Sequence, residues 1–230
     1  MIKKATFICA LMFSYLFSAQ TVITKNLGDY NTLKVFNGIA VELIQSDTQR
    51  LEITGEKSER VKIKHVNNIL KISLPFSLNP ENNAAEGQVL IKLYYNKNID
   101  IIDANEGATI TSKDFNQDVL EVNSQERAFI NFTVKVRYLK VRASSGGIIK
   151  LTGTTENQEV NVDLYGVYNG FAMKVSGNSD VFAGTGAKAE VLTGDTLSAK
   201  VNFGGSIFYK GTPKLLKNKT VIGGVIQKRN

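Results

Sequence analysis

The sequence has one cysteine, one histidine, three prolines and no tryptophan in 230 residues. Cys9 lies inside an apolar run near the N-terminus, so the chain without that run has no thiol. This excludes disulfides, thiolate metal sites and a cysteine nucleophile. His65 alone gives a catalytic triad one candidate base and leaves a multi-histidine metal site without a second ligand. Because His65 alternates with Val61 and Ile63, we predict a structural residue on the half-buried face of a strand.

Long apolar runs are also scarce. The run at residues 5–17 is shorter than the roughly 20 residues that a membrane-spanning helix needs. A basic pair precedes it, and the small residues Ser18 and Ala19 follow it, which is the order of a signal peptide. We therefore predict a signal peptide over residues 1–19 and a mature chain that starts at Gln20. Such a chain is exported to the periplasm, the outer cell surface or the extracellular space, and it does not span a membrane.

The formal net charge is +7, and basic residues are mixed with acidic ones except near the C-terminus. There they accumulate at Lys214, Lys217, Lys219, Lys228 and Arg229. One interpretation is a solvated tail, and the other is attraction to acidic glycans or lipid headgroups. No nucleic-acid recognition motif is present, so we do not expect a nucleic acid partner.

Short segments with alternating apolar residues, rich in Val, Ile, Thr, Phe and Tyr, fill the chain. Clear examples are residues 39–45, 61–66 and 89–95. No segment beyond the apolar run keeps a 3.6-residue apolar period. The pattern predicts an all-β protein, in which residues 75–87 form one exposed loop because they contain two of the three prolines.

The second half of the chain repeats about every twenty residues. Residues 99–110, 119–130 and 138–149 align without gaps, and their fourth position is apolar. The same step continues this position along the chain as Ile102, Val122, Val141, Val162, Val181, Val201 and Val221. This period predicts a single-stranded parallel β-solenoid, similar to a β-helix, with coils of about 20 residues. The repeat is weaker before residue 99, which predicts a less regular N-terminal β portion.

Small residues are expected at the corners of the coils. One aligned position is small in all three segments, as Ala104, Ser124 and Ala143. A second holds Gly107 and Gly146, where glycine can adopt a positive φ, but Arg127 stands there in the coil between them. The stretch "SSGG" at residues 144–147 therefore predicts a corner. A phosphate-binding loop is the weaker alternative, because no helix and no P-loop lysine follow.

Three stretches carry a family resemblance: "FNGIAVELIQSD" from Phe36, "VNNILKI" from Val66 and "LSAKVNFGGSIFYKGTP" from Leu197. With the Gly-rich coils, they resemble the putative auto-transporter adhesin, head GIN domain family of secreted bacterial proteins. The resemblance implies a single head GIN-type β-solenoid domain over residues 20–230, exported and without an established enzyme activity. It supplies a fold more securely than a function.

The enzymatic alternative is a carbohydrate-active β-helix enzyme that acts on acidic polysaccharide. Such an enzyme needs carboxylates clustered on one face to hold Ca²⁺. Asp103 with Glu106, or Asp180 with Asp195, would each supply a pair, but no acidic position repeats on adjacent coils. We therefore predict no catalytic residue, no metal site and no cofactor.

Aromatic residues are the main candidates for binding, because their flat faces can stack on sugar rings or partner surfaces. Tyr165, Tyr168 and Phe171 lie close together in sequence, beside the predicted turn glycines Gly166 and Gly170. Packing in the core is the alternative. Three further aromatics are expected to cover the last coils against water: Phe203, Phe208 and Tyr209.

These observations together predict an exported, non-enzymatic binding or structural module of the cell envelope, adhesin-like in role. Its partner is a glycan or another surface component of the envelope. A purely structural component without a soluble ligand is a further alternative, and the polysaccharide enzyme is the runner-up.

Overall fold

The computed structural model describes residues 22–85 and 87–230. The predicted signal peptide, Cys9 and the predicted mature N-terminus at Gln20 lie outside the described residues. Within them the structure is nearly all β, with two short 3₁₀ helices, Ser58–Arg60 and Pro80–Asn82. Across the same residues, no helix combines the length and apolar character needed to cross a membrane.

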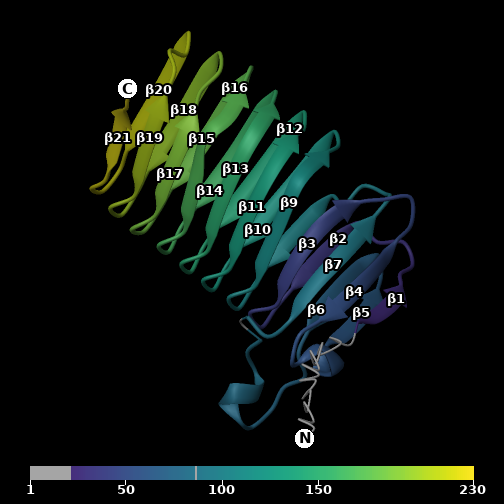
Figure 1. Ribbon diagram of the computed structural model, residues 1–230. Helices are drawn as coiled ribbons and strands as arrows, with labels where there is room; N and C mark the ends of the chain where they lie inside the picture. The colour runs from purple at the N-terminus through teal and green to yellow at the C-terminus, as the bar shows by residue number, and fades with distance from the viewer. Residues whose placement is uncertain (1–21, 86) are drawn as a thin grey trace, which may run out of the picture.

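The strands form two sheets that run side by side along the molecule (Figure 1). Sheet A contains, in spatial order, β1 (Ile23–Asn26), β4 (Arg50–Thr54), β7 (Leu90–Tyr95), β3 (Ala40–Gln45), β9 (Thr109–Asn116), β11 (Phe129–Lys135), β13 (Ile148–Thr155), β15 (Val167–Val175), β17 (Lys188–Leu192), β19 (Ser206–Lys210) and β21 (Val225–Lys228). Sheet B contains β20 (Leu215–Thr220), β18 (Thr196–Val201), β16 (Asn178–Ala183), β14 (Asn157–Val162), β12 (Tyr138–Ala143), β10 (Val119–Ser124), β8 (Ile101–Ala104), β2 (Thr32–Val35), β6 (Ile69–Ser73) and β5 (Lys62–Val66).

From β8 onward the chain alternates between the sheets, so each coil contributes one strand to each sheet and pairs in parallel with the coils before and after it. This arrangement confirms the predicted β-solenoid, with coils of about 19 residues. The N-terminal portion is less regular, as expected. There β4 pairs antiparallel with both β1 and β7, and β5 pairs antiparallel with β6.

The core lies between the two sheets, because alternate side chains of every coil point inward. Strand pairing defines one inward row as Ile102, Val122, Val141, Val160, Val181 and Ala199. The sequence alignment placed Val162 and Val201 in this row, which is wrong by two residues. Val162 instead pairs with Ala143, and both stay buried because a two-residue shift on a strand keeps the same face. Val221 lies beyond β20 and is 48% exposed.

The corners after the sheet B strands are two-residue turns, and in most of them both residues have left-handed backbone. Ser145 and Gly146 have φ of 50° and 75°, and the Gly147 N–H donates to the Ser144 carbonyl (2.8 Å). The predicted corner at "SSGG" is therefore confirmed. Arg127 has a φ of 61°, so it adopts the same conformation as the glycines in neighbouring coils. The corner geometry is kept there despite the side chain.

Successive turns stack on one another and form one long edge of the solenoid, which we call the turn edge (Figure 1). The Gly146 N–H donates to the Leu164 carbonyl (3.0 Å), and the Tyr165 N–H donates to the Thr185 carbonyl (2.9 Å). The turns of this edge are centred on residues 37–38, 106–107, 126–127, 145–146, 164–165, 185–186, 203–204 and 222–223. The opposite edge carries the connections that lead back from sheet A to sheet B.

The long connection between β6 and β7 also leaves the solenoid at the turn edge. Its Ala85 N–H donates to the Asn37 carbonyl (2.8 Å), while Phe76 and Leu78 are 85% and 92% exposed. The Lys57 ammonium group donates to two carbonyls of this connection, at 2.6 and 2.7 Å. The predicted exposed loop over residues 75–87 is thereby confirmed for its described part.

Candidate functional site

The three aromatics predicted as a binding cluster lie in three different environments. Tyr165 is at the turn edge and 69% exposed, and its ring lies against the next turn, at Gly186. Tyr168 is fully buried between the sheets, so its ring is not accessible from the surface. Phe171 is half-buried on the outer face of sheet A, where the Lys210 ammonium lies 5.1 Å from its ring centroid. The structure does not bring them into one surface.

Tyr168 belongs to a small buried polar network. Its hydroxyl donates to Gln158 Oε1 (3.3 Å), and Gln158 Nε2 donates to Ser179 Oγ (3.0 Å). Burial raises the pKa of the Tyr168 hydroxyl well above its ordinary value. The sequence predicted a turn at Gly170, and this is wrong. Gly170 lies within β15, beneath the ring of Tyr168. A Cβ at Gly170 would be 2.4 Å from Tyr168 Cζ, so glycine there makes room for the ring.

The three aromatics of the last coils also lie in different environments: one is buried, one half-buried and one exposed. Tyr209 is 8% exposed and covers the core, as predicted. Phe208 is half-buried, with the Arg229 guanidinium 4.3 Å from its ring centroid. The prediction is wrong for Phe203, which is 56% exposed because it occupies the tip of a turn. The basic C-terminal residues are spread over both sheets, and Lys214 pairs with Asp195 at 3.0 Å.

Sequence reasoning missed a shallow groove of about 580 Å³ across the outer face of sheet B, from β10 to β18. Two rows of outward side chains line it. The row nearest the opposite edge consists of Val119, Tyr138, Asn157, Asn178 and Thr196. The second row consists of Glu121, Lys140, Glu159, Asp180 and Ser198. The signal available in the sequence was the alternation of β12, which turns Tyr138 outward in phase with Lys140.

Hydrogen bonds preorganise the first row of the groove. Asn157 Oδ1 accepts both the backbone N–H and the Nδ2 of Asn178 (each 3.0 Å), and Thr196 Oγ1 donates to Asn178 Oδ1 (2.6 Å). Tyr138 is 46% exposed, with the Arg137 guanidinium 5.3 Å from its ring centroid. The groove thus offers one aromatic face beside a fixed row of amides and hydroxyls.

The carboxylate pairs considered from sequence do not form. The Asp103 carboxylate pairs with Lys34 (3.2 Å), whereas Glu106 accepts a hydrogen bond from Asn37 (2.6 Å). Asp180 has Glu159 and Ser198, not Asp195, as its neighbours across the strands. The expectation that no acidic position repeats on adjacent coils is therefore wrong for Glu159 and Asp180. In the part of the chain that the structure describes, no three or more His, Cys, Asp or Glu residues gather as a metal site.

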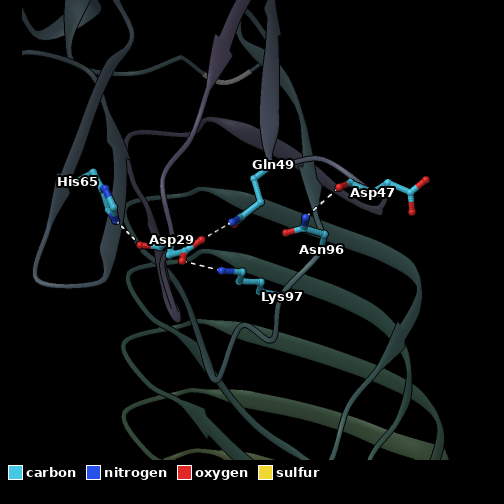
Figure 2. A network of polar contacts seen from close by, with 6 residues as sticks. All are labelled: Asp29, Asp47, Gln49, His65, Asn96 and Lys97. Carbon is cyan, nitrogen blue, oxygen red and sulfur yellow. Dashed lines mark hydrogen bonds and ion pairs between the residues drawn. The ribbon is translucent and has the colours of Figure 1, made fainter.

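His65 takes part in a polar network near the N-terminal end of the solenoid (Figure 2). Its Nε2 lies 2.6 Å from the Asp29 carbonyl, and the Asp29 carboxylate accepts hydrogen bonds from Lys97 (2.6 Å) and Gln49 (2.9 Å). Hydrogen bonding to Lys97 lowers the pKa of Asp29. His65 is exposed rather than half-buried, because β5 is the edge strand of sheet B. The network joins strand β5 to three connections, those between β1 and β2, between β3 and β4 and between β7 and β8, which is a structural role.

Comparisons with known proteins agree with this architecture. The sequence matches the family model for the "Putative auto-transporter adhesin, head GIN domain" over residues 29–213. A structure of a "putative adhesin" from Bacteroides fragilis is similar with a TM-score of 0.80 at 17% identity, over 92% of this chain and 98% of that chain. None of the curated proteins searched matches the sequence.

Two other solved structures are also similar. One is a "Putative lipid binding protein" from Parabacteroides distasonis, with a TM-score of 0.68 at 17% identity, over 93% of this chain and 98% of that chain. The other is a "putative adhesin" from Parabacteroides merdae, with a TM-score of 0.64 at 18% identity and the same coverage of 93% and 98%. At such identities these structures establish the fold alone.

Proposed function

The chain belongs to the putative auto-transporter adhesin, head GIN domain family, and on that basis we propose that it is an exported, non-enzymatic binding module of the cell envelope. Its family and structural neighbours are described as binding proteins, which suggests a binding role and does not favour the enzyme alternative. We further propose that its ligand is an extended glycan, bound in the groove across sheet B.

The observation that carries this proposal is the regular row of polar side chains in the groove. Neighbouring strands are about 4.8 Å apart, which is similar to the length of one pyranose residue in an extended β-linked polysaccharide. A glycan that crosses the strands would therefore advance by about one sugar residue per strand, and from β14 to β18 it would meet a polar side chain of the first row at each step. Tyr138 would stack on one sugar ring, while Asn157 and Asn178 would hydrogen-bond to hydroxyl groups further along.

The charge of the groove favours one class of glycan. Its lining carries three carboxylates, on Glu121, Glu159 and Asp180, and one ammonium group, on Lys140. Lys140 lies 3.6 Å from Glu121, so these two charges largely offset each other. Glu159 and Asp180 would repel an acidic polysaccharide. We therefore expect a neutral glycan, or one with free amino sugars, as the ligand.

Of the aromatics predicted from sequence, Tyr165 and Phe171 stay candidate contact residues, each on a different surface. Neither lines the groove, and the ring of Phe171 already contacts a lysine. Tyr138 is therefore the residue to test first.

The test is calorimetric titration of the purified protein with neutral, amino-sugar-containing and acidic polysaccharides. Replacing Tyr138 by Ala should weaken binding roughly 2- to 12-fold, because one aromatic stacking contact contributes about 0.5–1.5 kcal/mol. Tyr94→Ala is a matched control, since Tyr94 lies on the outer face of sheet A with the Arg50 guanidinium 3.7 Å from its ring centroid. Equal losses in both variants, tighter binding of the acidic polysaccharide, or its cleavage would each contradict the proposal.

A further inference from the structure

Among the stacked turns of the turn edge, those in the C-terminal half expose large apolar side chains. Leu164, Tyr165, Phe203 and Ile222 are 49%, 69%, 56% and 58% exposed. All four lie at the tips of turns along this half of the edge. The turn between them has Thr185 and Gly186 at its tip, and the Tyr165 ring lies against Gly186, so the four side chains form a narrow apolar row that is interrupted at Thr185. The equivalent tips of earlier turns carry polar side chains, as in Glu106, Glu126 and Ser145.

The backbone at these tips makes the apolar side chains unusual. Leu164, Tyr165 and Phe203 have φ of 46°, 63° and 47°, a left-handed region that favours Gly, Asn and Asp. The turns do not require these residues, because Gly, Ser and Glu serve in the other coils. Burial accounts only in part for Leu164 and Phe203, since about half of each residue is exposed. Residues kept at strained, exposed positions are candidates for a contact outside the molecule.

The surface beside this apolar row is basic on the sheet B side. The outward row nearest the turn edge continues from Arg142 through Asn161 and Phe182 to Lys200 and Lys219, and it contains no carboxylate. On the sheet A side, Lys188 is neutralised by Glu190 (3.0 Å). The turn itself holds one carboxylate, Asp163, which accepts the N–H groups of Leu164 (2.8 Å) and Thr185 (2.7 Å).

The same edge carries a second apolar projection at its N-terminal end. Phe76 and Leu78 in the loop between β6 and β7 are the two most exposed of the large apolar side chains that the structure describes. Because Ala85 ties this loop to the turn at Asn37, both projections leave the molecule along one edge (Figure 1).

We propose that the turn edge docks on the surface of a lipid bilayer that contains anionic headgroups. Leu164, Tyr165 and Phe203 insert at the boundary between headgroups and acyl chains, and Lys200 and Lys219 lie against the phosphates. A bilayer fits the observations because it can adapt to a narrow convex row of tips. A stable protein interface instead needs about 800 Å² of complementary surface on each partner. This contact goes beyond the proposed glycan binding and uses a different surface.

The test is co-sedimentation of the purified protein with vesicles of phosphatidylcholine, with and without about 30% phosphatidylglycerol. The wild type should bind the anionic vesicles more tightly than the neutral ones. The double variant Leu164→Asn/Phe203→Asn should bind them at least about tenfold more weakly, because two partly inserted apolar side chains are lost. Since asparagine tolerates a left-handed backbone, the variant should keep the melting temperature of the wild type.

A matched control is Val66→Thr, because Val66 is 60% exposed at the hairpin between β5 and β6, on the opposite edge. It should leave vesicle binding unchanged. Lys200→Gln/Lys219→Gln should remove the preference for anionic vesicles. The proposal fails if the wild type does not bind vesicles, or if the double tip variant binds as the wild type does. Self-association that the tip variant abolishes, without vesicle binding, would instead make the edge a contact between proteins.

The outcome is separable from that of the glycan experiment. Tyr138 begins β12 at the opposite edge, and neither Leu164 nor Phe203 lines the groove. Loss of vesicle binding with glycan binding intact would concern the turn edge alone, and the reverse would concern the groove alone.

Discussion

Replacing Gly170 by alanine should destabilise the protein through a clash with Tyr168. An alanine Cβ would lie 2.4 Å from Tyr168 Cζ and 2.5 Å from its hydroxyl oxygen, distances that real Cβ atoms do not show. The ring is fully buried, so it cannot move aside into solvent. Overpacking of this kind costs about 1–3 kcal/mol. For a chain of this size we expect the melting temperature to fall by about 2–4 °C per kcal/mol.

A double-mutant cycle with Tyr168→Leu tests this cause directly. Tyr168→Leu alone removes the buried ring and leaves Gln158 Oε1 without its hydrogen-bond donor, so it should lower the free energy of unfolding by about 2–5 kcal/mol. In the double variant the smaller side chain makes room for the alanine. Its cost should therefore be about 1–3 kcal/mol less than the sum of the two single changes.

Thermal and urea unfolding followed by circular dichroism measure these differences. Gly204→Ala is the control, because a Cβ there meets no atom within 4 Å although φ is 78°. Gly204→Ala should lower the stability only through backbone strain. Its change in the free energy of unfolding should add to that of Tyr168→Leu. A Gly170→Ala variant with the stability of the wild type, or strict additivity of Gly170→Ala with Tyr168→Leu, would refute the packing of the ring over Gly170.

Two further predictions concern buried phenols and the strained turns. Burial raises the pKa of Tyr95 to about 12, and it also raises the pKa values of Tyr30 and Tyr168. The pKa of a tyrosine in the unfolded chain is about 10, so the stability that the neutral phenols contribute is complete below pH 10 and is lost as the pH rises towards 12. Unfolding midpoints that stay constant from pH 10 to pH 12 would contradict this prediction. Arg127→Gly should raise the free energy of unfolding by about 0.5–1 kcal/mol, because glycine relieves the left-handed strain at φ of 61°. A melting temperature below that of the wild type would contradict this prediction and show that the contacts of the arginine outweigh the backbone strain.

The fold was predictable because two periods of the sequence agree. Alternation every second residue indicated strands, and the twenty-residue repeat indicated stacked coils. The register in which neighbouring coils pair was harder to predict from the sequence. Val160 and Val162 point to the same side of β14, so either one aligns with Val141 by apolar character. The turn would have decided between them, since Asp163 occupies the position of Ser144 and both accept the hydrogen bond that closes their turn.

The aromatic cluster failed as one surface for reasons that the sequence only partly shows. Tyr165 lies in the turn that the Gly166 N–H closes on the Asp163 carbonyl, whereas Tyr168 lies within β15 and points into the core. Gly166, directly after Tyr165, was the available signal of that turn. Phe171 lies three residues after the buried Tyr168, so strand alternation alone places it on the outer face. The bulge of β15 between the partners of Lys150 and Thr152 changes the alternation only after Phe171: Ala172 also faces outward and Met173 points inward, which local sequence does not encode.

In a solenoid, hydrogen bonds between coils fix the backbone, so the outward side chains can differ from coil to coil without changing the fold. The two proposed surfaces use this freedom at opposite ends of the same strands. Tyr138 and Asn157 begin their strands, whereas the turns at Ser145 and Leu164 follow the strand ends. Six residues of strand span about 20 Å. A molecule docked by its turn edge would therefore hold the groove above the bilayer and parallel to it, open to a glycan that runs along the surface.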